Sequence, residues 1–79
     1  MTKEEIKKII DNLNLRLAMS GSSVEVVDFD GNNLKLKLNC SNKDIFKVKG
    51  KIVTFEEETK KFVDKYLKEK IQNISIILL

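Results

Sequence analysis

The sequence contains no histidine, no proline and no tryptophan, and it has a single cysteine. Without histidine it lacks the usual general base that activates a serine or cysteine nucleophile. It also has no serine in a nucleophile-elbow motif and no glycine-rich phosphate loop. One cysteine excludes an internal disulfide framework. We therefore expect a protein that is not an enzyme.

Long hydrophobic runs are also missing. The apolar stretch at residues 74–79 is far shorter than the roughly 20 residues that span a bilayer. Six of the first eight residues are polar or charged, which argues against a secretory signal. We expect a cytoplasmic protein with no membrane partner.

The charge is nearly balanced overall but unevenly distributed. Fifteen basic and twelve acidic residues leave a net charge of +3, which is weak evidence for a polyanionic partner. The middle of the chain is locally basic, and only Asp44 opposes its lysines there. These lysines are candidate contacts to a nucleic acid or a protein partner: Lys35, Lys37, Lys43, Lys47, Lys49 and Lys51.

Two segments have the signature of amphipathic helices. Thr2 and Glu5 have the spacing of a capping box, and Thr54 and Glu57 repeat it. The first helix has apolar residues at helical spacing. It is expected to fray early, because Asn12 and Asn14 are poor helix formers. The expected buried stripes are Ile6, Ile9, Ile10, Leu13 and Leu17 in the first helix, and Phe62, Val63, Tyr66, Leu67 and Ile71 in the second. The motif Ser20-Gly21-Ser22-Ser23 is expected to end the first helix, and Asn73 the second.

Strands are predicted at about 24–29 and 33–39, joined by the tight connection Asp30-Gly31-Asn32-Asn33. Leucines alternate with lysines along the second strand, which is typical of a strand with one buried face. A last strand is expected at residues 74–79. Residues 40–53 leave two alternatives open: an irregular loop, or a second hairpin over residues 44–53 that turns at Lys49-Gly50.

This order predicts a single α+β domain over residues 1–79. We expect a two-layer α-β-β-α-β arrangement, in which two helices pack on one face of a small three-stranded sheet. A loop or hairpin is inserted before the second helix.

The hairpin and its neighbours resemble the C-terminal domain of NifU, the NFU family of iron–sulfur cluster carriers. The chain is similar at Gly21, at residues 24–31, at residues 34–38 and at residues 67–71, which read Leu-Lys-Glu-Lys-Ile. The order of elements also matches. The resemblance implies a binding or adaptor module linked to iron–sulfur cluster assembly, with a protein partner of that process.

The family's Cys-x-x-Cys motif is degenerate here. Lys43 stands at the second cysteine position if Cys40 is the first, and an ungapped alignment of the strand places Asn42 and Ile45 at the two positions. Iron–sulfur clusters ordinarily need four thiolates, and a homodimer supplies only two. We therefore expect no cofactor. Cys40 becomes a metal ligand only in a shared site completed by external or partner thiolates, and otherwise it is a small buried residue at a strand end.

The alternative function is that of a small basic nucleic-acid-binding domain. The α-β-β-α-β plan also occurs in KH-like domains, although their Gly-x-x-Gly clamp is absent. Lys47, Lys49 and Lys51 share one side if their segment is extended, which suits phosphate contacts. Lysines on an edge strand also serve simply to prevent aggregation.

One further surface is predicted on the side of the sheet that the helices leave open. Val27, Phe29, Ile77 and Leu79 are expected to form a small apolar patch there, bordered by Lys35 and Lys37. Such a patch suggests partner docking or a weak homodimer.

Overall fold

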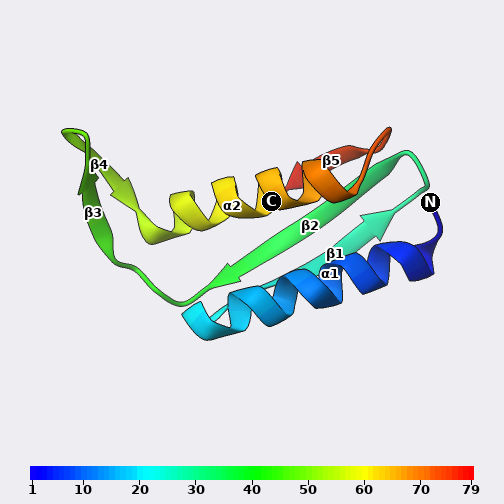
Figure 1. Ribbon diagram of the computed structural model, residues 1–79, viewed down its shortest axis with the longest axis horizontal. Coiled ribbons are helices and arrows are strands. Elements are labelled where there is room, and N and C mark those ends of the chain that lie inside the picture. Colours follow the sequence, from blue (N-terminus) through cyan, green and yellow to red (C-terminus); the bar gives the residue numbers. More distant parts are fainter.

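The computed structural model describes all residues from Met1 to Leu79 and confirms the α+β class. The helices are α1 (Lys3–Leu17) and α2 (Phe55–Lys70), and a short 3₁₀ turn, η1 (Ala18–Ser20), follows α1. The strands are β1 (Ser22–Phe29), β2 (Asn33–Cys40), β3 (Ile45–Val48), β4 (Lys51–Thr54) and β5 (Ser75–Leu78) (Figure 1).

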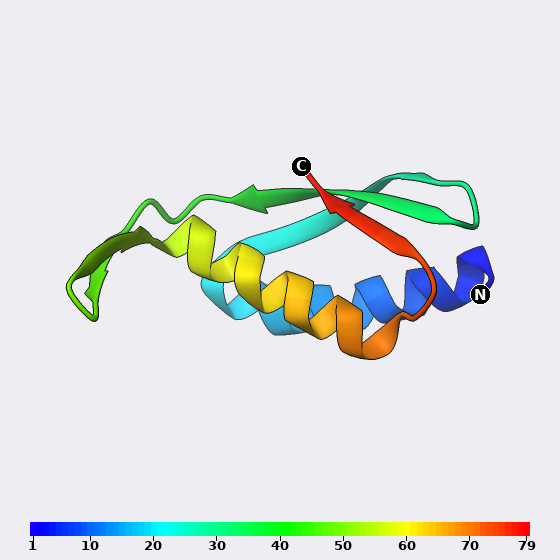
Figure 2. The same ribbon diagram turned by 90° about the horizontal axis from the view of Figure 1, so that it is seen from above.

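The main sheet has three strands in the order β1-β2-β5, and both helices lie on one side of it (Figure 2). β1 runs antiparallel to β2, whereas β5 runs parallel to β2. β2 is therefore the central strand, and β1 and β5 are the two edges. This is the predicted two-layer architecture.

The core fills the space between the helices and the sheet. Leu34, Leu36 and Leu38 of β2 point into it, as the alternation with lysine predicted. The second helix departs from its predicted stripe, because Phe62 is exposed and Tyr66 is only partly buried. The buried cluster consists of Ile6, Ile10, Leu13, Leu17, Val24, Leu34, Leu36, Leu38, Val63, Leu67 and Ile71.

α1 begins with the predicted capping box. The Thr2 hydroxyl accepts from the Glu5 amide at 3.2 Å, and the Glu5 carboxylate accepts from the Thr2 amide at 3.0 Å. These contacts also hold the pKa of Glu5 below its usual value, since hydrogen bonds from Thr2 favour the charged carboxylate. The expected early fraying is wrong, because α1 continues to Leu17. Asn14 contributes to this outcome by bonding to β1 through its side chain.

α2 is capped at Thr54, whose hydroxyl accepts from the Glu57 amide at 3.1 Å. Its first turn is acidic and its last turn is basic, which suits the helix dipole at both ends. The helix ends at Lys70, earlier than predicted. Asn73 instead occupies the turn into β5 with a φ of 63°, a conformation that asparagine adopts more readily than most residues.

Residues 45–54 form a second hairpin, which resolves the alternatives left open by the sequence. Lys49 and Gly50 both have positive φ, 52° and 81°, as a two-residue type I′ turn requires. We call this hairpin the arm; its strands β3 and β4 form a sheet of their own that projects beyond the main body (Figures 1 and 2). The molecule measures 41 × 22 × 18 Å, and its radius of gyration of 13.2 Å exceeds the ~12 Å expected for a compact chain of this length.

Candidate binding surfaces

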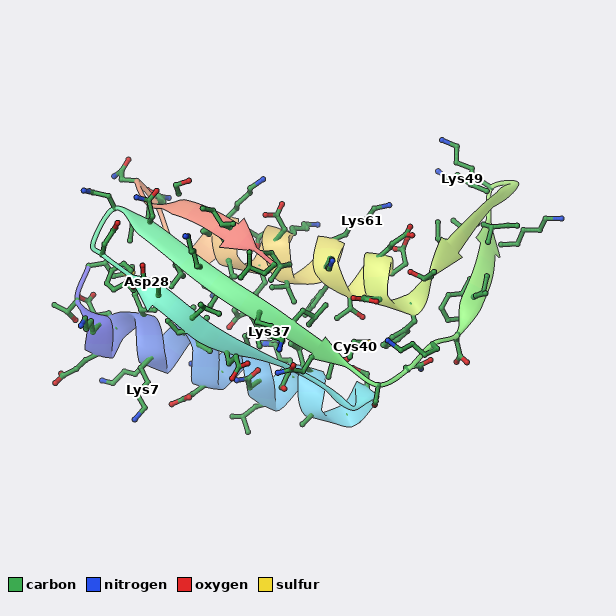
Figure 3. The ribbon with its side chains drawn as sticks, turned by 180° about the vertical axis from the view of Figure 1, so that it is seen from behind. Lys7, Asp28, Lys37, Cys40, Lys49 and Lys61 are labelled. Carbon is green, nitrogen blue, oxygen red and sulfur yellow. The ribbon has the colours of Figure 1, made fainter.

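Cys40 lies at the end of β2, where the chain leaves the main sheet for the arm (Figure 3). The side chain is partly buried against the core. Its sulfur accepts from the Ser22 hydroxyl at 3.5 Å and donates to the Asn42 carbonyl at 3.5 Å. No group of three or more metal-ligating side chains surrounds it. Cys40 is thus held by local contacts at a strand end.

The surface of the main sheet opposite the helices, which we call the open face, is charged rather than apolar. Glu25 lies directly opposite Lys37 across the β1–β2 pair, and Asp28 lies opposite Lys35. Asp28 and Lys37 are labelled in Figure 3. Opposite charges at paired positions stabilise an antiparallel sheet modestly. Lys35 and Lys37 are therefore exposed on this face beside acidic residues of β1.

The four residues expected to form an apolar patch on the open face are not brought together. A β-bulge between Val26 and Asp28 leaves Val27 unpaired and shifts Phe29 into register with Leu34. Phe29 consequently turns to the helix side, where it packs against the core. Ile77 pairs with Lys35 and remains on the open face, while Leu79 is exposed beyond the end of β5. Phe29 is thus removed from the predicted patch, whereas Val27 stays exposed at the bulge.

The six lysines do not form one stripe either. Lys35 and Lys37 belong to the main sheet, and the others lie on the arm or just before it. Within the arm, Lys47 pairs with Ile52 and Val48 pairs with Lys51, so the two lysines point to opposite faces. Lys49 sits at the tip, pointing away from the body (Figure 3). The arm is therefore basic on both faces and at its end.

The arm also exposes apolar side chains. Ile45 and Ile52 share the face of Lys47 and are 67% and 72% exposed. The other face carries Phe46 and Val48, which are less exposed. No other part of the chain covers the face of Ile45 and Ile52.

The base of the arm is fixed to α2. The rings of Phe46 and Phe55 lie 6.4 Å apart with a tilt of 55°, within the range of favourable aromatic pairs. The Phe55 amide donates to the Asp44 carbonyl at 2.9 Å. These contacts position the arm, so its outer face is presented in a defined direction.

Two features of the structure are not predicted by the sequence patterns described above. The first is the exposure of Ile45 and Ile52, which is indicated by apolar residues on both faces of a four-residue strand, because a projecting hairpin leaves one face uncovered. The second is Asn14, whose amide bonds β1. Asparagine within an apolar helical stripe is the available signal for such a contact.

Neither helix has the length and apolar composition needed to cross a membrane. No protein-family model, curated protein or solved structure matches the chain. Its function is therefore argued from the surfaces themselves.

Proposed function

We propose that this protein is a non-catalytic binding module whose arm docks a protein partner. The observation that carries the proposal is the exposure of Ile45 and Ile52 on one face of a projecting hairpin. A two-stranded hairpin is only marginally stable by itself in water. Covering two isoleucine side chains contributes roughly 1.5–3 kcal/mol each at full burial. Burial of this face against an apolar partner surface therefore stabilises the arm and contributes to the affinity of the complex.

The positive charge of the arm indicates what kind of surface the partner presents. Lys47 lies on the same face as the two isoleucines, and Lys49 at the tip is positioned to meet the rim of an interface. Asp44 is the only acidic residue among the lysines of this segment. The matching partner is a protein with an apolar pocket surrounded by carboxylates. Such complementarity chiefly speeds association and selects against basic partners.

Site-specific crosslinking tests the proposal. A photoreactive amino acid at position 52 is expected to capture a partner in cells, and the double variant Ile45→Ser with Ile52→Ser is expected to abolish co-purification of that partner. Loss of two buried isoleucines predicts a decrease in affinity of at least about a hundredfold. The captured protein, once purified, allows this decrease to be measured directly.

Leu15 provides a matched control. It is 73% exposed on α1, remote from the arm, and Leu15→Ser removes about as much exposed apolar surface as either isoleucine substitution alone. Binding that is unchanged in the arm variant but reduced by Leu15→Ser contradicts the proposal. Circular dichroism of both variants checks that the core is intact.

Nucleic acid is the second candidate, favoured by the lysines on both faces and at the tip of the arm. If Lys43, Lys47, Lys49 and Lys51 all contact phosphates of a single strand, the logarithm of the binding constant falls with the logarithm of salt concentration at a slope of about −2.8. Replacing the four lysines by glutamine then flattens that slope. Absence of RNA binding at low salt eliminates this candidate.

The finer link to iron–sulfur cluster assembly rests on the resemblance to the NFU family alone. Cys40 is the single thiol of the chain, and two copies supply two thiolates. In this proposal, a protein partner that shares an iron–sulfur cluster with Cys40 supplies the remaining thiolate ligands. The arm, rather than Cys40, is the part of the protein that recognises the partner.

A further inference from the structure

Tyr66 brings together two cations from different helices. The guanidinium carbon of Arg16, in the last turn of α1, lies 5.6 Å from the centroid of the Tyr66 ring. The ammonium nitrogen of Lys70, in the last turn of α2, lies 5.8 Å from the same centroid. Both distances are within the range of a cation–π interaction. The half-buried ring therefore holds one cation from each helix in a defined position.

Neither of these cations has a carboxylate partner. The ion pairs of the chain lie within α2 and join Lys60, Lys61 and Lys68 to acidic residues. A basic residue in the last turn of a helix complements the helix dipole. That effect explains Arg16 and Lys70 separately, but it does not explain why both contact one ring. Two like charges held near each other favour a bound anion, because the anion offsets their mutual repulsion.

The two cations line a pocket of about 580 Å³ between α1 and α2. This volume is within the range of small-molecule sites. None of the six residues that line the pocket is acidic. The amide of Asn12, one turn before Arg16 on α1, adds a neutral hydrogen-bonding group, and Met19 adds an apolar side chain that is 95% exposed. The pocket thus combines two positive charges with uncovered apolar surface.

We propose that this pocket binds a phosphate monoester that carries an apolar group. Arg16 is the only arginine of the chain, and the planar guanidinium group suits paired contacts to two oxygens of one anion. Lys70 supplies the second positive charge. A phosphate monoester carries a charge of about −1.5 to −2 at neutral pH, whereas a carboxylate carries a single negative charge. The monoester therefore matches the two cations better, and Met19 is placed to contact its apolar group.

Two kinds of molecule supply this chemistry. One is a soluble phosphate monoester, and the other is a phospholipid whose headgroup is a phosphate monoester. Both present the same anion beside an apolar group, so the pocket recognises the same feature in each. The pocket lies on the helices and includes no residue of the arm, so this proposal does not depend on the function proposed for the arm.

Titration with phenyl phosphate, followed by NMR of the backbone amides, tests the soluble ligand. Benzoate has the same ring and a single charge, and it is expected to bind about threefold more weakly because one exposed charge contact is lost. Arg16→Gln removes a charge-assisted paired contact and is expected to weaken phenyl phosphate binding about tenfold. Lys70→Gln is expected to weaken it about threefold. Both residues are exposed, so neither substitution disturbs the core.

Lys68→Gln is the matched control. It removes the same charge from the last turn of α2, but Lys68 lies outside the pocket and pairs with Asp64 at 2.9 Å. It is therefore expected to leave the affinity for phenyl phosphate unchanged. An equal loss in Lys68→Gln and Arg16→Gln overturns the proposal, because binding would then follow net charge alone.

Vesicle sedimentation tests the lipid. Phosphatidylcholine vesicles that contain phosphatidic acid are compared with vesicles of equal surface charge that contain phosphatidylserine. A preference for phosphatidic acid that is lost in Arg16→Gln and reduced in Met19→Ser assigns the lipid as the source of the monoester. Binding of phenyl phosphate without this preference assigns a soluble monoester. Failure to bind either probe, or equal binding of benzoate and phenyl phosphate, overturns the proposal.

Discussion

The same substitution is expected to have opposite effects at two asparagines of α1. Asn12→Ala should stabilise the protein, whereas Asn14→Ala should destabilise it. Asn12 is exposed and its side chain makes no hydrogen bond, so alanine only improves helix propensity, by about 0.5 kcal/mol. Asn14 gains the same amount from alanine but loses its contacts to the backbone of β1.

The magnitude follows from two hydrogen bonds. The Asn14 side chain donates to the Val24 carbonyl at 3.0 Å and accepts from the Val24 amide at 2.8 Å. Each contributes about 1 kcal/mol to stability, because folding exchanges it for bonds to water. Subtracting the gain in helix propensity leaves a net loss of about 1.5 kcal/mol for Asn14→Ala. The difference between the two variants, about 2 kcal/mol, isolates the hydrogen bonds because the propensity gain cancels.

Urea unfolding followed by circular dichroism measures this difference. With an m-value of about 1 kcal/mol/M for a small domain, Asn14→Ala shifts the midpoint down by about 1.5 M, and Asn12→Ala shifts it up by about 0.5 M. Hydrogen exchange at the Val24 amide should accelerate in Asn14→Ala alone. Equal shifts in the same direction for both variants would refute the reasoning, since Asn14 would then act only through helix propensity.

Three further predictions concern the cysteine and the two hairpin turns. Anaerobic reconstitution with iron and sulfide, without added thiols, should give a colourless protein, and a brown product that survives desalting and is lost in Cys40→Ser would contradict this. The Asp30 carboxylate accepts from the Asn32 and Asn33 amides, which lowers its pKa, so its stabilising contribution is present above about pH 4 and is lost as pH falls through the lowered pKa. The difference in Tm between wild type and Asp30→Asn should therefore shrink in acid. Gly50→Ala forces alanine into a φ of 81°, which should cost about 1–2 kcal/mol locally and increase amide exchange in the arm while leaving exchange in the core unchanged.

The elements of the fold could be predicted because local signals agree with the tertiary structure. The alternation of leucine and lysine in β2 marks the one strand whose two faces differ most, and the structure buries all three leucines. Thr2 and Thr54 mark the helix starts through hydrogen bonds made within the first turn. These contacts are local, so the sequence alone specifies them.

The surfaces were harder to predict because they depend on register. A strand of strict alternation places Val27 and Phe29 together on the open face. The bulge adds one residue to β1, and that addition reverses the side on which Phe29 lies. The turn at Lys49-Gly50 has a similar effect on the lysines, since it reverses the chain between Lys47 and Lys51. Neither consequence can be predicted from the spacing of residues along a single extended strand.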